Sequence, residues 1–319
     1  MRTAIISTVR NEGPAVEHFI ENLLSQSRTP DQIVICDGGS TDDTVEHLHR
    51  LTKKYSSLTV ISKPGSIAVG RNAAIATAKA DIIAVTDAGS RVDEHWFEEI
   101  TSPFADKAIS AVAGYYAIDP QTPFEAASGY LMNQNASELD DSWLPSSRSI
   151  AFRKHVWEKV GGYPEDLTFA GEDTLFDIRI VEAGFPFKFQ PSAIVYWRPR
   201  PTLHAFYRQY FLYAKGDGQR WPESRGYTKK IITYIIFLAL LVSGFILSPS
   251  IIIADAILYL AYLLFRARKT WQRSHNFSYF LRSIPLVIVF DKATLMGFFR
   301  GMFDWIRTPL YRKPYEITR

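Results

Sequence analysis

The stretch QIVICDGGSTDDT, residues 32–44, sets an apolar run directly against an acidic, glycine-rich segment. Residues 33–36 are all apolar, which is typical of a strand buried on both faces of a parallel sheet. The run ends at Asp37, and Gly38 and Gly39 follow it. Because glycine lets the backbone approach a ligand closely, the stretch predicts a buried strand that ends at a ligand-binding loop.

The residues after the two glycines predict the start of a helix. Ser40 and Thr41 are typical capping residues, and a helical pattern follows them to residue 55. We therefore expect Ser40 and Thr41 mainly to cap that helix. Asp37 lies upstream of the cap and is not needed for it, so this stretch alone leaves two interpretations of Asp37 open, a turn aspartate and a ligand-binding aspartate.

Outward from this stretch, short apolar runs alternate with helical patterns. Strands are expected at residues 3–9, 32–36, 58–62, 81–87 and 109–118, with a helix between each pair. Such alternation implies parallel strands joined by right-handed crossovers. The sequence therefore predicts an α/β fold, a three-layer sandwich with a mostly parallel sheet. Further along the chain we expect a helix over 170–185, a strand or strand pair over 187–197 and an aromatic-rich amphipathic helix over 201–218.

Composition excludes some classes of protein. The 319 residues carry a formal net charge of +3, which is too small to indicate a nucleic-acid partner. The single cysteine, Cys36, excludes an intramolecular disulfide and a multi-cysteine metal site, and within an apolar strand it is expected to be a buried core residue. The N-terminal apolar run is too short for a signal peptide, so we expect the part that precedes the apolar C-terminal segments to stay in the cytoplasm.

Polar clusters follow the first four predicted strands. In an open α/β sheet, ligands bind beyond the carboxyl ends of the strands. Asp37 and Asp87 each follow an apolar strand directly, and the two together favour a ligand site over two separate turn residues. Arg71, in the small-residue segment AVGRNAA, has two open interpretations, a contact with a phosphate or a base and a surface arginine paired with a carboxylate.

A second acidic point is the pair Glu172 and Asp173, which opens the predicted helix 170–185. The N-terminus of a helix favours negative charge, so a helix-start preference would explain an isolated acidic pair. Gly171 precedes this pair, and the run before it offers a strand, a short helix and a glycine turn. That arrangement favours delivery of both carboxylates to one place.

Six segments resemble the family-2 glycosyltransferases, which have the GT-A fold, and they occur in the family's order. They are STVRNEG, LLSQSRTPDQIVICDGGSTDDT, GRNAAI, AVTDAGS, GGYPEDLTFAGEDTLFDIRI and FYRQYFLYAKGDG, within residues 3–218. Six segments in register are specific to the family, although not to a substrate. The resemblance implies that a sugar is transferred from a nucleotide-diphosphate donor with inversion at the anomeric carbon.

The resemblance also implies roles for individual residues. Glu12 and Asp37 would contact the nucleoside, and Arg71 the base or the diphosphate. Asp173 matches the catalytic base of the family, with Glu172 beside it. The complete set of implied donor-binding residues is Glu12, Asp37, Gly38, Arg71, Asp87 and Arg208.

A divalent cation, Mg²⁺ or Mn²⁺, is expected at Asp87, which stands at the first position of the family's metal-binding Asp-x-Asp motif. A diphosphate leaving group needs its developing charge neutralised, commonly by a cation held through few carboxylates. This sequence departs from the motif, because Gly89 stands where the second aspartate is usual. His204 is a possible but displaced candidate ligand, and as a lone helical histidine it is interpreted here as a residue without that role. Arginine could replace part of the metal charge, the candidates being Arg198, Arg200 and Arg208.

Beyond Lys229 the chain turns apolar, and we expect two domains, a catalytic domain over 1–222 and a membrane-associated region over 223–319. Apolar runs predict a helical hairpin over about 231–265. Basic residues flank both outer ends of the hairpin, which predicts that both ends lie in the cytoplasm. A buried helical pair in a soluble domain and a re-entrant hairpin remain open alternatives. Residues 279–307 mix aromatic and charged residues and predict one or two amphipathic helices at the membrane interface.

The sequence therefore predicts a glycosyltransferase anchored to the cell membrane, with its catalytic domain on the cytoplasmic side. The apolar C-terminal region motivates a lipid-linked or membrane-proximal acceptor in cell-envelope glycan synthesis. A nucleotidyltransferase is the first alternative, but it would carry a glycine-rich, basic loop after the first strand, and TVRNEG lacks that pattern. A non-catalytic nucleotide-sugar-binding membrane protein is the second, and the intact acidic pair argues against it.

Overall fold

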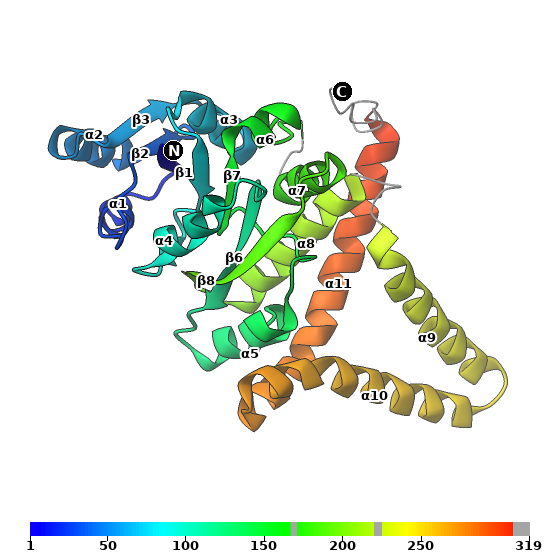
Figure 1. The fold of residues 1–319 in the computed structure, drawn as a ribbon. Coiled ribbons are helices and arrows are strands. Elements are labelled where there is room, and N and C mark those ends of the chain that lie inside the picture. Colours follow the sequence, from blue (N-terminus) through cyan, green and yellow to red (C-terminus); the bar gives the residue numbers. More distant parts are fainter. Residues whose placement is uncertain (167–170, 220–224, 309–319) are drawn as a thin grey trace. The chain divides into compact units, whose positions relative to one another are not determined.

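The computed structural model describes residues 1–166, 171–219 and 225–308, and these form two compact units (Figure 1). The first unit combines residues 1–119 with 135–198. The second combines residues 120–134 with the described residues from 199 onward. The predicted domain boundary at residue 222 falls outside the described residues. By packing alone, the segments 120–134 and 199–219 group with the C-terminal helices.

The first unit is built on a mixed sheet of eight strands. They are β1 (Thr3–Val9), β2 (Gln32–Asp37), β3 (Leu58–Ser62), β4 (Ile82–Val85), β5 (Ser90–Val92), β6 (Ala111–Ile118), β7 (Ile150–Arg153) and β8 (Phe187–Trp197), in the spatial order β3-β2-β1-β4-β7-β6-β8-β5. β1 pairs in parallel with β2 and β4, β2 with β3, and β6 with β8. β7 runs antiparallel between β4 and β6, and β5 is antiparallel to β8. The predicted α/β fold is confirmed.

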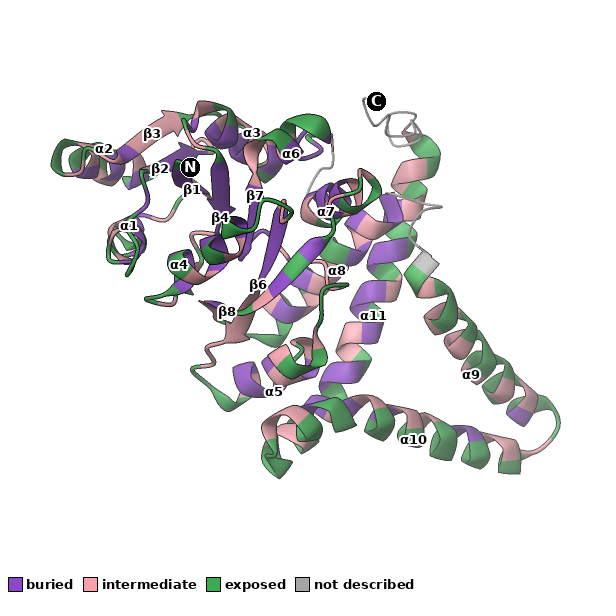
Figure 2. Cartoon of the chain, viewed as in Figure 1, coloured by how far each residue is buried: buried purple, intermediate pink, exposed green. Residues whose placement is uncertain are grey.

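Helices cover both faces of this sheet. They are α1 (Ala15–Leu24), α2 (Thr44–Lys54), α3 (Ile67–Thr77), α4 (Trp96–Thr101), α6 (Lys154–Lys159) and α7 (Glu172–Glu182), with short 3-10 turns at Ser102–Ala105 and Ala136–Glu138. Successive strand residues point to opposite faces. Ile5 and Ile33 pack with α1, α2 and α4 in one core cluster, whereas Ile6 and Val34 pack with α3, α6 and α7 in another. The three layers are therefore helices, sheet and helices, and Figure 2 shows the buried strands between the more exposed helices.

The carboxyl ends of the parallel strands meet at one edge of the sheet, as their registers require. Val9 is level with Asp37 on the neighbouring strand, and Ile6 is level with Val85. The loops after β1, β2 and β4 therefore leave the sheet at the same edge. This carboxyl edge carries the polar segments that the sequence singled out. Cys36 is a buried free cysteine in the core, as predicted.

The second unit is helical within its described residues. It contains α5 (Pro123–Met132), α8 (Leu203–Gln219), α9 (Thr228–Ile246), α10 (Pro249–Ser274) and α11 (Phe277–Arg307), with a 3-10 turn at Arg225–Tyr227. α8 and α11 approach so closely at Gly297 and Gly301 that a side chain on either glycine would meet the α8 backbone. Residues 279–307, predicted as one or two amphipathic helices, belong to the single helix α11, which has Pro285 inside it.

α9 and α10 form the helical pair that the sequence predicted over about 231–265. Both helices are long and apolar enough to cross a membrane. Ser248 caps α10 by accepting a hydrogen bond from the Ser250 N–H, and Pro249 occupies the first turn, so the predicted turn between the two helices is present. Many large apolar side chains on both helices are exposed, including Ile235, Phe245 and Ile257. The exposed residues along α9 and α10 can be followed in Figure 2.

Candidate active site

The loop after β2 is organised around Asp37. Its carboxylate, only 2% exposed, accepts hydrogen bonds from the Gly39 N–H at 3.1 Å and from the N–H and hydroxyl of Ser40. The prediction that Ser40 caps the next helix is wrong, because α2 begins only at Thr44 and Ser40 lies upstream of its cap position; the Ser40 hydroxyl donates to Asp37 instead. Asp37 therefore has a structural role in its own loop, whatever else it binds.

Asn11 ties the loop after β1 to the loop after β2. Its side-chain oxygen accepts a hydrogen bond from the Thr41 N–H at 2.8 Å, and its own N–H donates to the Ser40 hydroxyl at 2.9 Å. Thr41 thus binds Asn11 and does not cap α2, so this prediction is also wrong. Asn11 adopts a left-handed backbone conformation (φ 56°), which asparagine tolerates better than most residues. Sequence reasoning missed Asn11, although its place in the polar segment TVRNEG at the end of a predicted strand was a usable signal.

Glu12 lies in the same pair of loops. Its N–H and that of Gly13 both donate to the Thr44 hydroxyl, at 2.9 and 2.8 Å. Partial burial raises the pKa of the Glu12 carboxyl, and the negative charge of Asp42 raises the pKa further. The structure therefore places Glu12 and Asp37, the two predicted nucleoside contacts, in loops that hydrogen bonds hold together at the carboxyl edge.

Arg71 joins two carboxylates that are far apart in the sequence. The guanidinium, 2% exposed, donates from Nη2 to Asp87 Oδ1 at 2.7 Å and from Nη1 to Glu172 Oε1 at 2.8 Å. Burial alone would lower the pKa of Arg71, but the charges of Asp87 and Glu172 outweigh it and raise the pKa. The guanidinium therefore stays charged. Arg71 pairs with carboxylates in a buried rather than a surface position, and its contact with a phosphate or a base of the donor stays a prediction.

The acidic pair opens α7, as predicted. Gly171 precedes the helix with φ 95°, a conformation that favours glycine, and the chain turns there into α7. Residues 167–170 of the predicted glycine turn lie outside the described residues. Glu172 is buried and held by Arg71, whereas Asp173 is partly exposed and accepts a hydrogen bond from the Thr174 N–H. Burial raises the pKa of Glu172, and the charge of Asp173 adds to this, against the opposing effect of Arg71.

Two further residues hold this cluster, and sequence reasoning missed both. The Tyr163 ring lies under Arg71, with the guanidinium carbon 5.3 Å from the ring centroid, and it stacks on Phe176 of α7 at 4.0 Å. Asn72 accepts hydrogen bonds from the Tyr163 N–H and from the Trp157 indole, both at 2.9 Å. Asn72 adjoins Arg71 in the GRNAA segment, so its position in that segment was the available signal.

Asp177 is a further residue of this cluster that the sequence did not single out. It lies on α7 four residues after Asp173, is 1% exposed, and neither carboxylate oxygen has a hydrogen-bond partner in the described structure. Burial raises the pKa of Asp177 well above its usual range, and the charge of Asp173 adds to this effect, whereas the charge of Arg71 opposes it. These shifts favour the neutral acid.

The residues around Asp87 can be compared with the needs of a divalent cation. Asp87 uses one oxygen for Arg71, and its side chain is 27% exposed. No group of three or more His, Cys, Asp or Glu side chains that could hold a metal ion occurs among the described residues. A Cβ at Gly89 would meet nothing within 4 Å, so the place of the missing second aspartate is open. The residues present therefore fit a cation that takes most of its ligands from phosphates and water, as Mg²⁺ commonly does.

The remaining candidates are not brought into this cluster by the described contacts. Arg208 and His204 are exposed residues of α8, in the second unit. Arg200 donates from Nε to the Gln209 side chain at 3.3 Å within that unit. The roles suggested for Arg208, His204, Arg200 and Arg198 stay predictions.

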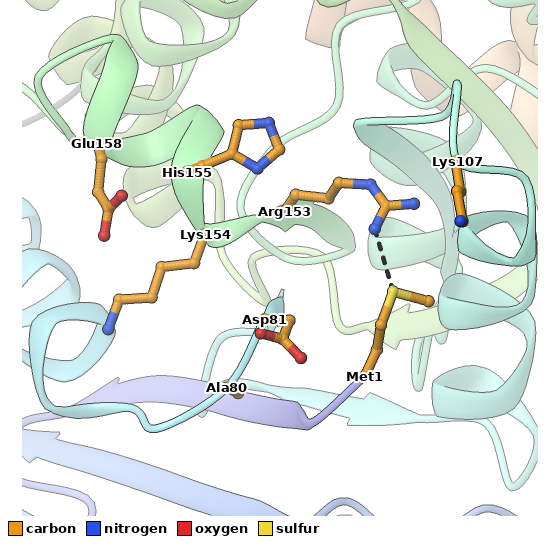
Figure 3. Close-up of a pocket in the computed structure, with 8 residues that line it drawn as sticks. All are labelled: Met1, Ala80, Asp81, Lys107, Arg153, Lys154, His155 and Glu158. Atoms are coloured by element: carbon orange, nitrogen blue, oxygen red, sulfur yellow. Dashed lines mark hydrogen bonds between the residues drawn. The ribbon is translucent and has the colours of Figure 1, made fainter.

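A surface hollow of about 660 Å³ lies at the opposite edge of the sheet (Figure 3). Its lining comes from the amino ends of β1 and β4, the end of β7, the helix α6 and the segment before β6. The lining residues are Met1, Ala80, Asp81, Lys107, Arg153, Lys154, His155 and Glu158. Inside it, Arg153 Nη1 lies 3.1 Å from the sulfur of Met1. This hollow holds none of the candidate residues, so the candidate active site is the acidic cluster at the carboxyl edge.

Comparisons with known proteins bear on the family of this chain. The model of glycosyl transferase family 2 matches residues 4–158, and that of glycosyl transferase family group 2 matches residues 82–267. The succinoglycan biosynthesis protein ExoA of Rhizobium meliloti is 26% identical over 237 residues, which cover 69% of this chain and 70% of that protein. The O-antigen chain rhamnosyltransferase WbaN of Salmonella anatum is 26% identical over 229 residues, which cover 66% and 70%.

Among solved structures, the mannosyltransferase PcManGT from Pyrobaculum calidifontis, in complex with GDP-Man and Mn²⁺, is similar to this chain with a TM-score of 0.69 at 17% identity. The similarity covers 95% of this chain and 87% of that one. This similarity and the sheet topology show that the chain has the GT-A fold. The model of glycosyl transferase family group 2 covers more than half of the residues, and that of family 2 matches most of the remaining N-terminal part. The chain therefore belongs to the family-2 glycosyltransferases, and the predicted resemblance is confirmed.

Proposed function

We propose that this protein transfers a sugar from a nucleotide-diphosphate donor to a hydroxyl of a lipid-linked or membrane-proximal acceptor, with inversion, in the synthesis of a cell-envelope glycan. The observation that carries the proposal is the pair of hydrogen bonds made by Arg71. They join Asp87, proposed to hold the cation and the donor phosphates, to Glu172, the neighbour of the candidate base Asp173. The names of the relatives support an envelope polysaccharide, since one acts in succinoglycan biosynthesis and another is an O-antigen rhamnosyltransferase.

The donor would be held by the loops at the carboxyl edge. Glu12, Asp37 and Gly38 lie in the two loops that Asn11 fastens together, and a nucleoside placed there would meet carboxylates that accept hydrogen bonds. Asp37 already accepts backbone N–H groups with the same carboxylate, so its loop is pre-organised before the donor arrives. Arg208 is proposed as a further donor contact from α8.

Asp87 would hold a divalent cation together with the donor phosphates. The chemistry that Mg²⁺ or Mn²⁺ supplies there is neutralisation of the charge that develops on the leaving diphosphate. The structure of PcManGT contains Mn²⁺, which supports the choice of a divalent cation. The open space at Gly89 is consistent with a site in which phosphate and water provide the other ligands.

Asp173 would act as the general base. Of the two acids that open α7, Glu172 is buried and occupied by Arg71, whereas Asp173 is partly exposed and can face an acceptor. As the acceptor oxygen attacks the anomeric carbon, its proton passes to the Asp173 carboxylate and the bond from that carbon to the diphosphate breaks. Attack opposite to the leaving group inverts the anomeric configuration and releases a nucleoside diphosphate.

The membrane would be reached through α9 and α10. Each is apolar enough to cross a bilayer, and basic residues stand at the outer ends of the pair, Lys229 and Lys230 at one end and Arg266, Arg268 and Arg273 at the other. Positive charge marks cytoplasmic ends, so we place both outer ends, and the catalytic domain with them, on the cytoplasmic side. An acceptor carried by a membrane lipid then meets the enzyme at the surface where it is anchored.

The test is a donor screen on the purified full-length protein, which measures nucleoside diphosphate release with and without a membrane lipid extract. We expect release that requires the extract and stops when EDTA is added. Release of pyrophosphate would instead identify a nucleotidyltransferase. Donor binding without turnover, unchanged in Asp173→Asn, would identify a non-catalytic binder. Full turnover on water-soluble acceptors alone would contradict the lipid-linked acceptor.

A further inference from the structure

A second charged cluster lies among the helices of the second unit and contains none of the candidate active-site residues. Lys230 of α9 and Arg266 of α10 both contact Asp291 of α11, with Nζ at 2.9 Å and Nη1 at 3.4 Å from the same carboxylate oxygen. Lys230 also donates to the Thr294 hydroxyl at 2.8 Å. Two cations from two different helices therefore converge on one acid.

The charges of this cluster do not cancel. Asp291 is fully buried and supplies one negative charge against the two positive charges. The cations are not sealed inside, because the side chains of Lys230 and Arg266 are 15% and 29% exposed. Arg266 makes its contacts with Tyr262 and Asp291 through Nη1. The cluster can therefore bind an anion on its exposed side and keep the hydrogen bonds that it already has.

Both cations lie at the same distance from the turn of the apolar helical pair. Lys230 and Arg266 are each about 18 residues from Ser248, which caps α10, or about 27 Å along a helix that rises about 1.5 Å per residue. The hydrocarbon core of a bilayer is about 30 Å thick, and the phosphate headgroups lie just outside it. With the turn placed at the far boundary of the core, both cations lie at the near boundary, level with the phosphates.

Aromatic side chains hold the two cations in place. The Tyr262 hydroxyl accepts a hydrogen bond from Arg266 Nη1 at 2.8 Å. The rings of Tyr262 and Phe290 have their centroids 5.7 and 5.9 Å from the guanidinium carbon of Arg266. Lys230 Nζ lies 4.3 Å from the centroid of the Phe290 ring. Because both cations are already ordered, less side-chain entropy is lost when a ligand binds to them.

We infer that Lys230 and Arg266 form a binding site for the phosphate headgroup of an anionic membrane lipid. The inference rests on the proposed placement of α9 and α10 in the membrane, and it does not depend on the sugar-transfer reaction. A phosphate group offers the negative charge and the acceptor oxygens that ammonium and guanidinium groups bind strongly. Basic sites between membrane helices on the cytoplasmic side bind such headgroups, since anionic lipids are abundant in that leaflet.

A bound lipid would also complete the cluster. Its phosphate supplies the second negative charge that Asp291 alone does not provide. Its acyl chains would lie against apolar side chains that α9 and α10 expose, among them Ile235 and Leu258. One lipid molecule would thus contact the charged base and the apolar length of the helical pair, and would fasten the pair to one leaflet.

A general interfacial role for the two cations makes a different prediction. Lysine and arginine side chains near helix ends often extend their charged groups toward water without binding a particular lipid. Arg268 has this character, because it is exposed and its guanidinium carbon lies 3.9 Å from the centroid of the Phe265 ring. If only the total charge of the region matters, Arg266 and Arg268 should contribute equally to lipid binding. A specific site requires a larger contribution from Arg266.

The experiment titrates the purified full-length protein in detergent with dioleoylphosphatidylglycerol or dioleoylphosphatidylcholine. Native mass spectrometry then gives the dissociation constant of the first bound lipid. We expect the unaltered protein to bind phosphatidylglycerol more tightly than phosphatidylcholine. Arg266→Gln should weaken phosphatidylglycerol binding about fivefold, the usual contribution of one basic residue near an anionic membrane, and should leave phosphatidylcholine binding unchanged. Arg268→Gln, the matched control on the same helix, should change neither affinity.

Three outcomes would overturn the inference. The first is equal affinity of the unaltered protein for the two lipids, and the second is equal loss of phosphatidylglycerol affinity in Arg266→Gln and Arg268→Gln. The third is phosphatidylglycerol binding that inorganic phosphate abolishes and sodium chloride of the same ionic strength does not, because this would identify a site for free phosphate. If Arg266→Gln does not fold, Lys230→Gln decides in the same way against Lys229→Gln, which alters its exposed neighbour.

The same titration separates this inference from the proposed function. If the unaltered protein retains neither lipid, the membrane placement of α9 and α10 is contradicted and the lipid site with it. If it retains both lipids equally, the lipid site alone is contradicted. Neither result changes the outcome of the donor screen, which measures nucleoside diphosphate release and tests the sugar transfer separately.

Discussion

Each of the two units contains a buried charged cluster, and the two clusters are built in opposite ways. In the second unit, Asp291 of α11 is fully buried and accepts hydrogen bonds from the Tyr234 and Tyr262 hydroxyls, at 3.0 and 2.7 Å. The same carboxylate pairs with Lys230 at 2.9 Å and with Arg266 at 3.4 Å. α9 and α10 each contribute a tyrosine and a cation, so both oxygens of one acid are occupied.

In the first unit, a single guanidinium serves several acids. Arg71 binds Asp87 and Glu172, its Nε remains without a partner among the described residues, and Asp177 is equally unsatisfied. The raised pKa values of Glu172 and Asp177 have the same origin, burial in a region with too little positive charge.

The difference shows how a fixed polar cluster differs from a reactive one. A cluster in which every polar group has a partner gains no hydrogen bond or ion pair by rearranging. The cluster around Asp291 therefore fixes α9, α10 and α11 to one another at the base of the helical pair. An unsatisfied acidic cluster is unfavourable until a positive ligand arrives, and perturbed acids of this kind gather at functional sites. The predictions below test this contrast.

Removal of the base should have the largest effect. Asp173→Asn keeps the shape of the side chain but cannot accept the acceptor proton, so kcat should fall by about 10²- to 10⁴-fold, the usual contribution of a general base. The donor dissociation constant should change little, because Asp173 is not proposed to bind the donor. Steady-state rates of nucleoside diphosphate release and donor titrations measure the two quantities. Glu182→Gln, which changes an exposed acid on the same helix, is the matched control. A kcat of Asp173→Asn equal to that of this control would show that Asp173 is not the base.

Removal of the acid from the satisfied cluster should instead affect stability. Asp291→Ala leaves Lys230 and Arg266 without their counter-charge, and loss of one partner of a buried pair typically costs about 3–5 kcal/mol. Thermal unfolding of the full-length protein in detergent should show a clearly lower melting temperature. Mn²⁺ affinity of the folded protein should be unchanged. A melting temperature equal to that of the unaltered protein would mean that the cluster does not hold the helices.

Asp37→Ala should act mainly on donor binding. Loss of hydrogen bonds to a charged group costs about 1.5–3 kcal/mol, so KM for the donor should rise roughly 10- to 100-fold. kcat should fall much less, because Asp37 lies in a binding loop apart from Asp173. Part of the effect will come from the loop itself, since the carboxylate holds Gly39 and Ser40. A large fall in kcat with an unchanged KM would mean that the roles of Asp37 and Asp173 are exchanged.

Gly89→Asp should strengthen the cation site. The position is open, so the added side chain should cause no clash, and a second carboxylate restores the usual Asp-x-Asp motif. We expect Mn²⁺ to bind about tenfold more tightly, equivalent to about 1.4 kcal/mol. Gly89→Asn, which adds the same bulk without the charge, is the control. No gain with aspartate over asparagine would argue against a cation next to residue 89.

The smallest effect concerns the pH dependence of stability. Burial raises the folded-state pKa of Asp177 above its unfolded value, so the folded protein binds this proton more tightly than the unfolded chain does. Its contribution to stability is therefore fully present below the unfolded pKa and is lost as pH rises toward the folded pKa. Asp177→Asn removes that loss. The melting temperature of the variant minus that of the unaltered protein should therefore increase from pH 4 to pH 8. A difference that stays constant over this range would contradict the raised pKa of Asp177.

The sequence predicted the fold because its signals are local. The apolar runs at β1, β2 and β4 and the helical patterns between them identify a layered α/β unit, and the registers then place Asp37 and Asp87 at one edge. Strand direction is not local information, so the antiparallel course of β7 was not predicted. β5, with only three residues, is too short to give a periodic signal.

The candidate site was predicted residue by residue but not as a network. Arg71 and Glu172 are 101 positions apart, and no spacing rule reveals that they touch. The capping prediction for Ser40 failed because α2 begins only at Thr44, so Ser40 lies upstream of the cap position, and its hydroxyl accepts from the Asn11 N–H and donates to Asp37 instead. Asp177, four residues after Asp173, has the spacing of any acid on a helix surface, and only its burial distinguishes it.

The most direct test of the central claim, that the acidic cluster at the carboxyl edge is the reaction centre, is a crystal structure of the full-length protein with Mn²⁺ and the nucleoside diphosphate that the donor screen selects. The account predicts an anomalous Mn²⁺ peak at coordination distance, about 2.1 Å, from Asp87, with the diphosphate bound to it and Asp173 facing the open side. A nucleotide bound instead in the hollow lined by Asp81 and Lys154, with no Mn²⁺ at Asp87, would contradict the account.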